Sequence, residues 1–156
     1  MTEDQKKHAA ELKRLQKDKR FREKIDRRKT QIMNEIPCFK EKYKFADDAE
    51  NEKIKSFLSM IPSLTPLRPD FTKLSFSESI SIDDCKSMNG EVWLAFLEGD
   101  EVLLKIGVLG CISDFAGDID DWICFGSYML FLFGDMNSFI FIDDNSEITY
   151  AQIFLS

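Results

Sequence analysis

The first 36 residues constrain the fold most strongly, because they favour a helix but carry few large apolar side chains. Residues 3–36 contain no Gly or Pro, are dominated by Lys, Arg, Glu, Gln and Leu, and end directly before Pro37. This pattern predicts one long helix that is capped by Thr2 or Asp4. We expect the helix to dock along one edge of a body or partner, because its apolar stripe is thin. The stripe consists of Leu12, Leu15, Phe21, Ile25, Ile32 and Ile36.

Charge is sorted along the chain. Residues 1–45 hold 15 Lys and Arg against 8 Asp and Glu, a net charge of +7. Residues 46–156 hold 6 Lys and Arg against 20 Asp and Glu, a net charge of −14. The pattern indicates two parts, a basic helical arm over residues 1–36 and an acidic globular domain over residues 37–156. We expect the acidic domain to repel nucleic acid and anionic membranes, and to attract a basic protein.

The rest of the chain predicts an α+β fold. Asp47 or Asp48 begins a second helix that runs to about Met60, and residues 75–87 contain a weak alternation typical of an edge strand. From Asn89 onward the pattern is that of short strands and tight turns, which favours an antiparallel sheet over residues 90–155 with the N-terminal helices packed on one side. The predicted strands are Val92–Leu97 and Val102–Val108, joined by a hairpin turn at Glu98–Glu101, then Trp122–Phe125, Met129–Phe133, Phe139–Ile142 and Ile148–Leu155. We expect Trp122 to be at least half buried.

The stretch Asp121–Tyr150 resembles the late part of the SUKH superfamily. The shared features are a Trp-initiated strand, a Gly turn, a Gly-Asp pair, an apolar strand that ends in Asp, and a short turn before a final strand. The matching positions are Trp122, Gly126, Gly134, Asp135, Phe139, Phe141, Ile142 and Asp143, and Asn89-Gly90 is similar to the family's Asn-Gly turn before the sheet.

The SUKH superfamily includes fungal cell-wall-assembly regulators and many bacterial immunity proteins that neutralise toxins. The resemblance therefore implies an α+β fold and a role as a toxin-binding protein in the cytoplasm. Two features depart from the family pattern. The segment Leu67–Phe71 is a poor copy of the family's Leu-Pro-x-x-Tyr helix, and the long basic helix has no counterpart in the minimal family domain.

The residue inventory gives no support for catalysis. His8 is the single histidine and lies near the start of a charged helix, where an oriented imidazole is not expected. The cysteines lack any Cys-x-x-Cys pair, and no phosphate-binding glycine motif occurs, so we expect no catalytic residue, no cofactor and no metal site. We expect the cysteines, Cys38, Cys85, Cys111 and Cys124, to be reduced. The longest apolar run, Tyr128–Phe133, is too short to span a bilayer, so we expect no membrane contact and a cytoplasmic location.

Function is therefore sought on surfaces, and the acidic segment Ser113–Asp121 is the first candidate. We interpret it as a loop, which is either a solvated surface, a patch that binds a partner, or a cation site, although its spacing differs from an EF-hand. The leading hypothesis is a protein, most concretely an immunity protein, that masks a basic partner such as a toxin domain. Its predicted acidic rim is Asp114, Asp118, Asp120, Asp121, Asp135, Asp143 and Asp144, with Phe115 and Tyr128 as apolar anchors.

The basic helix supplies the alternative hypothesis, in which the protein is a regulatory or scaffold protein. The cations between residues 13 and 29 form either a solvated or self-docking face, a contact for an anionic partner that includes nucleic acid, or part of a coiled-coil dimer. Nucleic acid is expected to bind only through this helix.

Overall fold

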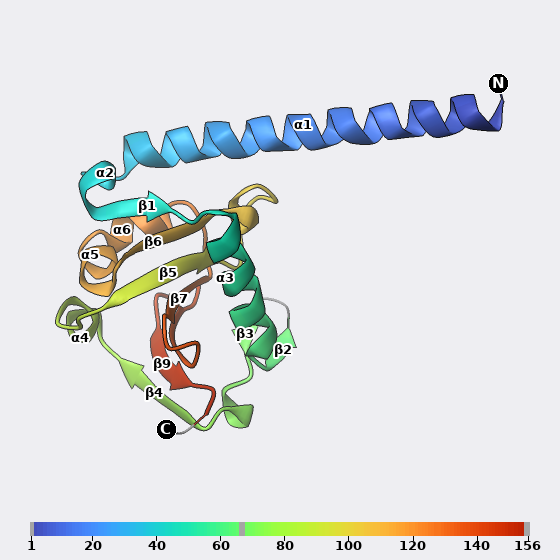
Figure 1. Cartoon of the computed structure of the whole chain (residues 1–156). Coiled ribbons are helices and arrows are strands. Elements are labelled where there is room, and N and C mark those ends of the chain that lie inside the picture. The colour runs from blue at the N-terminus through green and yellow to red at the C-terminus, as the bar shows by residue number, and fades with distance from the viewer. Residues whose placement is uncertain (1, 66–67, 155–156) are drawn as a thin grey trace.

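The first helix, α1, is a rod that is anchored to the body at one end. The computed structural model describes residues 2–65 and 68–154. Helix α1 spans Glu3–Glu35, as predicted, and Thr2 caps it through a reciprocal pair of hydrogen bonds with Gln5. Figure 1 shows that the N-terminal part of α1 extends beyond the body. Ile32 and Ile36, at the other end, are buried in the core, so the predicted arm shares its last residues with the body.

The docked part of α1 uses a mixed row of side chains. Arg28 forms an ion pair of 3.0 Å with Asp100 and lies 5.7 Å from the ring centre of Phe125. Lys29 lies 5.3 Å from the ring centre of Phe45. Ile25 also packs against the core, so the contact between α1 and the body combines apolar side chains with the cations of Arg28 and Lys29.

The body is built on a seven-stranded antiparallel sheet with the strand order β1-β6-β5-β7-β8-β9-β4. The predicted antiparallel sheet is confirmed, but it also recruits two strands from before residue 90. One of them, β4, is the predicted edge strand, and a separate pair of short strands, β2 and β3, lies outside the sheet. The strands are β1 (Tyr43–Phe45), β2 (Ser63–Thr65), β3 (Arg68–Pro69), β4 (Phe76–Ile80), β5 (Glu91–Phe96), β6 (Gly107–Cys111), β7 (Met129–Phe133), β8 (Ser138–Ile142) and β9 (Ile148–Gln152).

Helices cover both faces of the sheet, whereas packing on one side was predicted. Along β5, Leu94 belongs to a core shared with the end of α1 and with Trp122, while Ala95 belongs to a second core beneath α3. Because successive strand residues point to opposite faces, these two cores lie on opposite sides of the sheet. Helix α3 spans Asp48–Met60 and is capped by Asp47, as predicted, and it buries Phe57 in the second core.

The segment predicted as an acidic loop is helical. Helices α5 (Ile112–Gly117) and α6 (Ile119–Ile123) pack on the first face of the sheet and contain Trp122, so the predicted strand Trp122–Phe125 is wrong. The reason is a helical spacing of apolar residues that the acidic residues obscured. Ile112, Phe115, Ile119 and Trp122 recur at intervals of three and four residues. Trp122 itself is fully buried, which confirms the expectation of its burial.

The connection from β5 to β6 is longer than a simple hairpin. The chain turns at Glu98–Glu101, as predicted, but then forms a 3₁₀ turn, η2 (Leu103–Lys105), so β6 begins at Gly107 instead of Val102. Asp100 fixes this turn by accepting a 2.7 Å hydrogen bond from the backbone N–H of Leu103. Leu103 is buried in this turn, which keeps residues 102–106 out of the sheet until β6 begins.

The remaining elements are short. They are α2 (Phe39–Lys42), η1 (Phe71–Lys73) and α4 (Ile82–Lys86), and α4 replaces the second half of the edge strand that was predicted over residues 75–87. The predicted end of the last strand, Leu155, and Leu67 of the family comparison lie outside the described residues. No helix among the described residues combines the length and the apolarity that crossing a membrane requires.

Candidate functional site

One end of the sheet gathers three loops that lie far apart in the sequence. The register pairs Phe96 with Met129, Met129 with Ile142, and Ile142 with Ile148, so these residues form the last row of the sheet at this end. In an antiparallel sheet, the loops that leave this row must emerge on the same side. These loops are residues 97–106 after β5, residues 124–128 before β7 and residues 143–147 after β8.

The loops make this end of the sheet strongly acidic. We define the acidic end as Glu98, Asp100, Glu101, Asp143, Asp144 and Glu147 together with Tyr128. Lys105 is the single cationic residue that the three loops contain. Asp100, Glu101, Asp144 and Glu147 are exposed, and Glu98 is half-buried. The exposed carboxylates therefore come from two separate loops on either side of β7.

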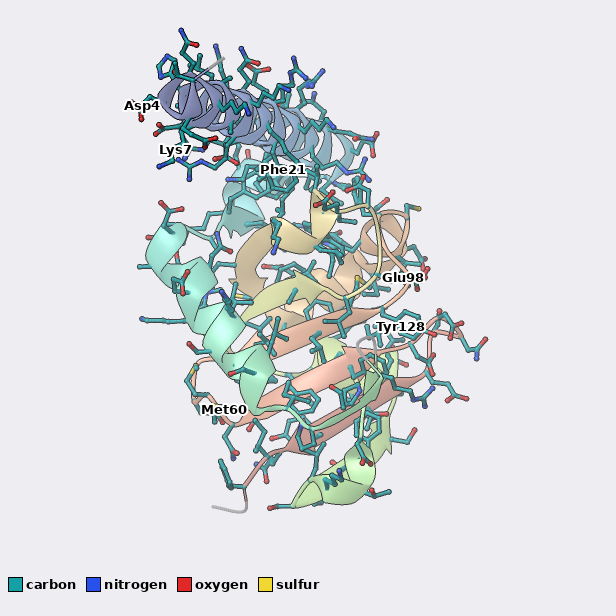
Figure 2. The ribbon with its side chains drawn as sticks, turned by 90° about the vertical axis from the view of Figure 1, so that its right-hand side faces the viewer. Asp4, Lys7, Phe21, Met60, Glu98 and Tyr128 are labelled. Carbon is teal, nitrogen blue, oxygen red and sulfur yellow. The ribbon has the colours of Figure 1, made fainter. Side chains whose placement is uncertain are left out.

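Tyr128 lies at the centre of the acidic end. Figure 2 shows Glu98 and Tyr128 close together on one flank of the body, below α1. The Tyr128 ring stacks on Phe141, with ring centres 6.0 Å apart and planes 16° apart. Its backbone carbonyl accepts a 2.8 Å hydrogen bond from Leu97, which holds it beside the end of β5. Tyr128 is thus a fixed, half-buried aromatic side chain among carboxylates.

The surroundings of Tyr128 keep its hydroxyl neutral. Loss of hydration, then the negative charges of Asp144 and Glu98, raise the pKa of the Tyr128 hydroxyl above its ordinary value, and the positive charge of Arg68 opposes them only in part. A neutral phenol donates a hydrogen bond and presents an apolar ring. Such a side chain, ringed by carboxylates, is suited to contact a basic and partly apolar protein surface.

A glycine allows two of these loops to touch. A Cβ placed on Gly126 would collide with the backbone carbonyl oxygen of Glu98. The loops enclose a hollow of about 300 Å³ next to Tyr128, and its lining includes Glu98, Phe125 and Ser127. The close backbone approach therefore shapes the surface beside the aromatic side chain.

Two of the predicted rim residues serve local structure. Asp143 is buried and accepts hydrogen bonds of 2.9 Å and 3.0 Å from the backbone N–H groups of Asn145 and Glu147. Asp135 accepts hydrogen bonds from the backbone N–H groups of Asn137 and Ser138, and from the Ser138 hydroxyl. Asp135 lies in the loop between β7 and β8, at the opposite end of the sheet from the acidic end.

Asp118 is likewise engaged inside the protein. The Tyr43 hydroxyl donates a 2.7 Å hydrogen bond to Asp118, and Lys42 forms an ion pair of 3.1 Å with it. The hydrogen bond to Asp118 raises the pKa of Lys42, and burial raises the pKa of Tyr43. Asp118 is only 13% exposed, so it joins α6 to β1 instead of facing a partner.

The other predicted site residues differ in their burial and in their position. Phe115 is fully buried against Trp122, so it is not available as an anchor and that prediction is wrong. Asp114 is half-buried on α5. Asp120 and Asp121 are exposed on α6, the helix that leads into the loop before β7. Asp143, Asp144 and Tyr128 are the predicted residues that lie at the acidic end, and Asp144 is the one that acts directly on Tyr128.

The sequence analysis missed four members of the acidic end, Glu98, Asp100, Glu101 and Glu147. A signal for them existed, because Glu98–Glu101 was predicted as a turn and residues 143–147 lie between two predicted strands, Phe139–Ile142 and Ile148–Leu155. Following the alternating direction of the strands from one turn to the other places both at the same end of an antiparallel sheet.

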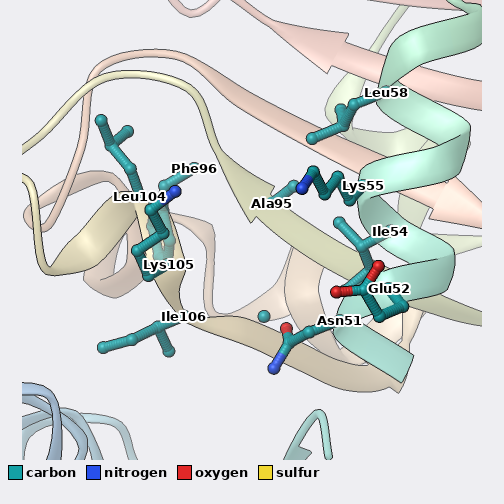
Figure 3. A pocket seen from close by; sticks show the side chains of 11 residues that line it. Asn51, Glu52, Ile54, Lys55, Leu58, Ala95, Phe96, Leu104, Lys105 and Ile106 are labelled. Atoms are coloured by element: carbon teal, nitrogen blue, oxygen red, sulfur yellow. The ribbon is translucent and has the colours of Figure 1, made fainter. Parts of the chain in front are cut away.

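A second hollow lies between α3 and the connection from β5 to β6. It has a volume of about 330 Å³, and Figure 3 shows Glu52 and Lys55 of α3 facing Lys105 across it. Its walls carry both signs of charge, so it does not select a charged partner as clearly as the acidic end does. Across the described ranges, no group of three or more His, Cys, Asp or Glu side chains is arranged to hold a metal ion.

Comparison of this chain with models of known protein families and with curated proteins gives no match.

Proposed function

We propose that this protein is a non-enzymatic binding module that covers a basic surface of a partner protein with its acidic end. The observation that carries the proposal is the fixed position of Tyr128 among carboxylates from two loops. Aromatic anchors supply binding energy where they are desolvated, and surrounding charges supply orientation and a faster encounter. The acidic end offers both.

The net charge of the body adds to this support. A net charge of −14 over residues 46–156 repels itself, so it is costly unless a partner balances it. Attraction of a cationic surface raises association rates by about 10- to 1000-fold at low salt. A basic partner is therefore favoured over a neutral or acidic one.

The most concrete form of the proposal is a toxin-neutralising immunity protein of the SUKH type, acting in the cytoplasm. This part rests on the resemblance of Asp121–Tyr150 to that superfamily. The strands β8 and β9 have the order of the apolar strand and the final strand of the resemblance, while the placement of Trp122 in a helix departs from it. A nuclease toxin suits this proposal, because its substrate groove is cationic and an acidic cover can block it.

The test pairs the full chain with the toxin domain encoded beside its own gene. Co-expression should restore growth, and stopped-flow mixing should give the association rate. The variant Glu98→Lys, Asp144→Lys, Glu147→Lys is compared with the matched control Glu52→Lys, Glu78→Lys, Glu91→Lys, in which exposed acids elsewhere on the body are reversed. Both variants carry the same net charge.

We expect the variant of the acidic end to associate at least about tenfold more slowly at low salt, and the control to stay within about threefold of the natural chain. Equal slowing of both would show that diffuse charge, and not the acidic end, is responsible. A gene neighbourhood without a toxin, or a toxin that the chain fails to bind, would contradict the immunity role.

A further inference from the structure

Six cations of α1 share one face of the helix. Lys6, Lys13, Lys17, Arg20, Lys24 and Arg27 follow one another at intervals of seven, four, three, four and three residues. At 3.6 residues per turn, these intervals place them in one row. Between Lys6 and Arg27 no acidic residue shares this row, which then continues through Gln31 to Glu35. We call these six residues the cationic stripe.

The stripe is not the face by which α1 docks on its own body. The docked row contains Phe21, Ile25, Arg28 and Ile32, which are half-buried or buried, whereas all six stripe residues are exposed. The sequence had suggested that the helix docks its cationic face on the acidic body. The ion pair with Asp100 is formed by Arg28, which belongs to the docked row and not to the stripe.

Among the described residues, the stripe forms no ion pair with its own body. Within residues 2–65 and 68–154, no stripe residue lies within 4.0 Å of an acidic partner. Lys17, Arg20 and Lys24 line a hollow of about 440 Å³ against the body, where Glu101 and Lys105 form the opposite wall. Asp100 lines a further hollow with Lys24 and Arg27, so two members of the acidic end lie near the stripe without pairing with it.

The direction of α1 carries the start of the stripe away from its own body. Figure 1 shows the N-terminal part of α1 passing beyond the body, toward the side from which Figure 2 is seen. A helix of 33 residues is about 50 Å long, so the free part can reach across to another body. A two-fold axis near this end would exchange the arms of two copies reciprocally.

We propose that the cationic stripe of one copy docks on the acidic end of a second copy. Charge complementarity favours this occupant, since the chain carries +7 in its first 45 residues and −14 in the remainder, and the N-terminal part of the arm passes beyond its own body. The inference uses the acidic end that the proposed function also uses. A basic partner would then compete with the arm of the second copy for that surface.

Sedimentation velocity on the full chain tests the proposal, at about 0.1 M salt and again at about 1 M, where the Debye length falls from about 10 Å to about 3 Å. The stripe variant is Lys13→Glu, Lys17→Glu, Arg20→Glu. Its matched control reverses three cations on other faces of the same helix, Lys7→Glu, Lys19→Glu, Arg22→Glu. The acidic-end variant is again Glu98→Lys, Asp144→Lys, Glu147→Lys, and circular dichroism confirms that each variant is folded.

We expect the natural chain to associate at low salt and to separate at high salt. The stripe variant and the acidic-end variant should each associate at least about tenfold more weakly, equivalent to about 1.4 kcal/mol, and the control much less. An equimolar mixture of the stripe variant and the acidic-end variant should form one-to-one pairs, because the reversed arm of one matches the reversed end of the other.

Four results would overturn the proposal. The first is a chain that stays monomeric at low salt, and the second is a control variant that weakens association as much as the stripe variant does. The third is a mixture of the two variants that fails to pair. The fourth is loss of association in the variant Leu12→Gln, Leu15→Gln while the charge variants still associate. The last result would indicate apolar helix pairing. Binding of a short DNA duplex by a chain that does not self-associate would assign the stripe to nucleic acid instead. The toxin-binding test does not involve the stripe variant, so the two proposals fail separately.

Discussion

The hydroxyl of Tyr43 donates a 2.7 Å hydrogen bond to Asp118, and this contact ties the edge strand β1 to the junction of α5 and α6. Tyr43 is 5% exposed, so removal of its acceptor would leave a buried hydroxyl without a partner. We expect Asp118→Ala to lower the free energy of unfolding by about 1–3 kcal/mol, measured by urea titration. Asp121→Ala, on the exposed side of α6, is the control and should stay within about 0.5 kcal/mol. Equal effects would contradict a structural role for Asp118.

Gly126 should tolerate no side chain, because a Cβ at this position would strike the backbone of Glu98. We expect Gly126→Ala to cost about 1–3 kcal/mol in the free energy of unfolding, since backbone must move to admit the methyl group. Gly117 makes a matched control, because a Cβ there would meet no atom within 4 Å. Thermal melting of both variants decides the point, and a stable Gly126→Ala protein would show that the two loops separate easily.

Asp135 should make stability depend on pH in the acid range. Burial would raise the pKa of this carboxyl, but the hydrogen bonds from Ser138 and Asn137 outweigh it and hold the pKa below the ordinary value of 3.8. Because the unfolded chain then binds the proton more readily, the stabilisation by Asp135 is complete above the ordinary pKa and is lost as the pH falls through the lower folded value. We expect the stability difference between the natural chain and Asp135→Ala to shrink between about pH 5 and about pH 2. A difference that is constant across this range would contradict the assignment.

The free part of α1 should contribute little to the stability of the body. Residues 11–20 are exposed throughout, whereas Ile32 and Ile36 lie in the core. Deletion of residues 2–20 is therefore expected to change the unfolding free energy by less than about 1 kcal/mol. Substitution of Ile32 by Ala should cost about 2–5 kcal/mol, because it opens a cavity in the core. Chemical denaturation compares the two, and a large loss on deletion would show that the free part packs on the body.

Sequence reasoning predicted the elements whose local signals agree with their packing. The cap at Asp47 and the alternation in Phe139–Ile142 are of this kind, since a capping side chain and a two-residue period each favour one structure. It failed at Ser113–Asp121, where four acidic residues suggested solvent but the apolar residues between them follow a helical period. Strand β1 was missed, because three residues are too few to show a pattern and its pairing with β6 decides its conformation.

From the sequence, a member of the candidate site could be predicted only where its side chain is exposed on a turn. Asp144 is such a residue, whereas Asp143, its direct neighbour, points inward to bind the backbone of the same turn. Composition treats these two residues alike, and only the turn geometry separates them. Phe115 was placed on the surface because helix α5 was unrecognised, and its partner Trp122 shows that it belongs to the core.

The burial of Ile32 gives the projecting helix a mechanical role. No glycine or proline interrupts α1, so the helix has no residue at which a sharp kink is expected. The helix therefore acts as a lever when a force is applied near His8. It would pivot at the contact of Arg28 with Asp100, and its short end, at Ile32, lies between the side chains of the core. Whatever grips the tip of the helix therefore pulls on the interior of the body.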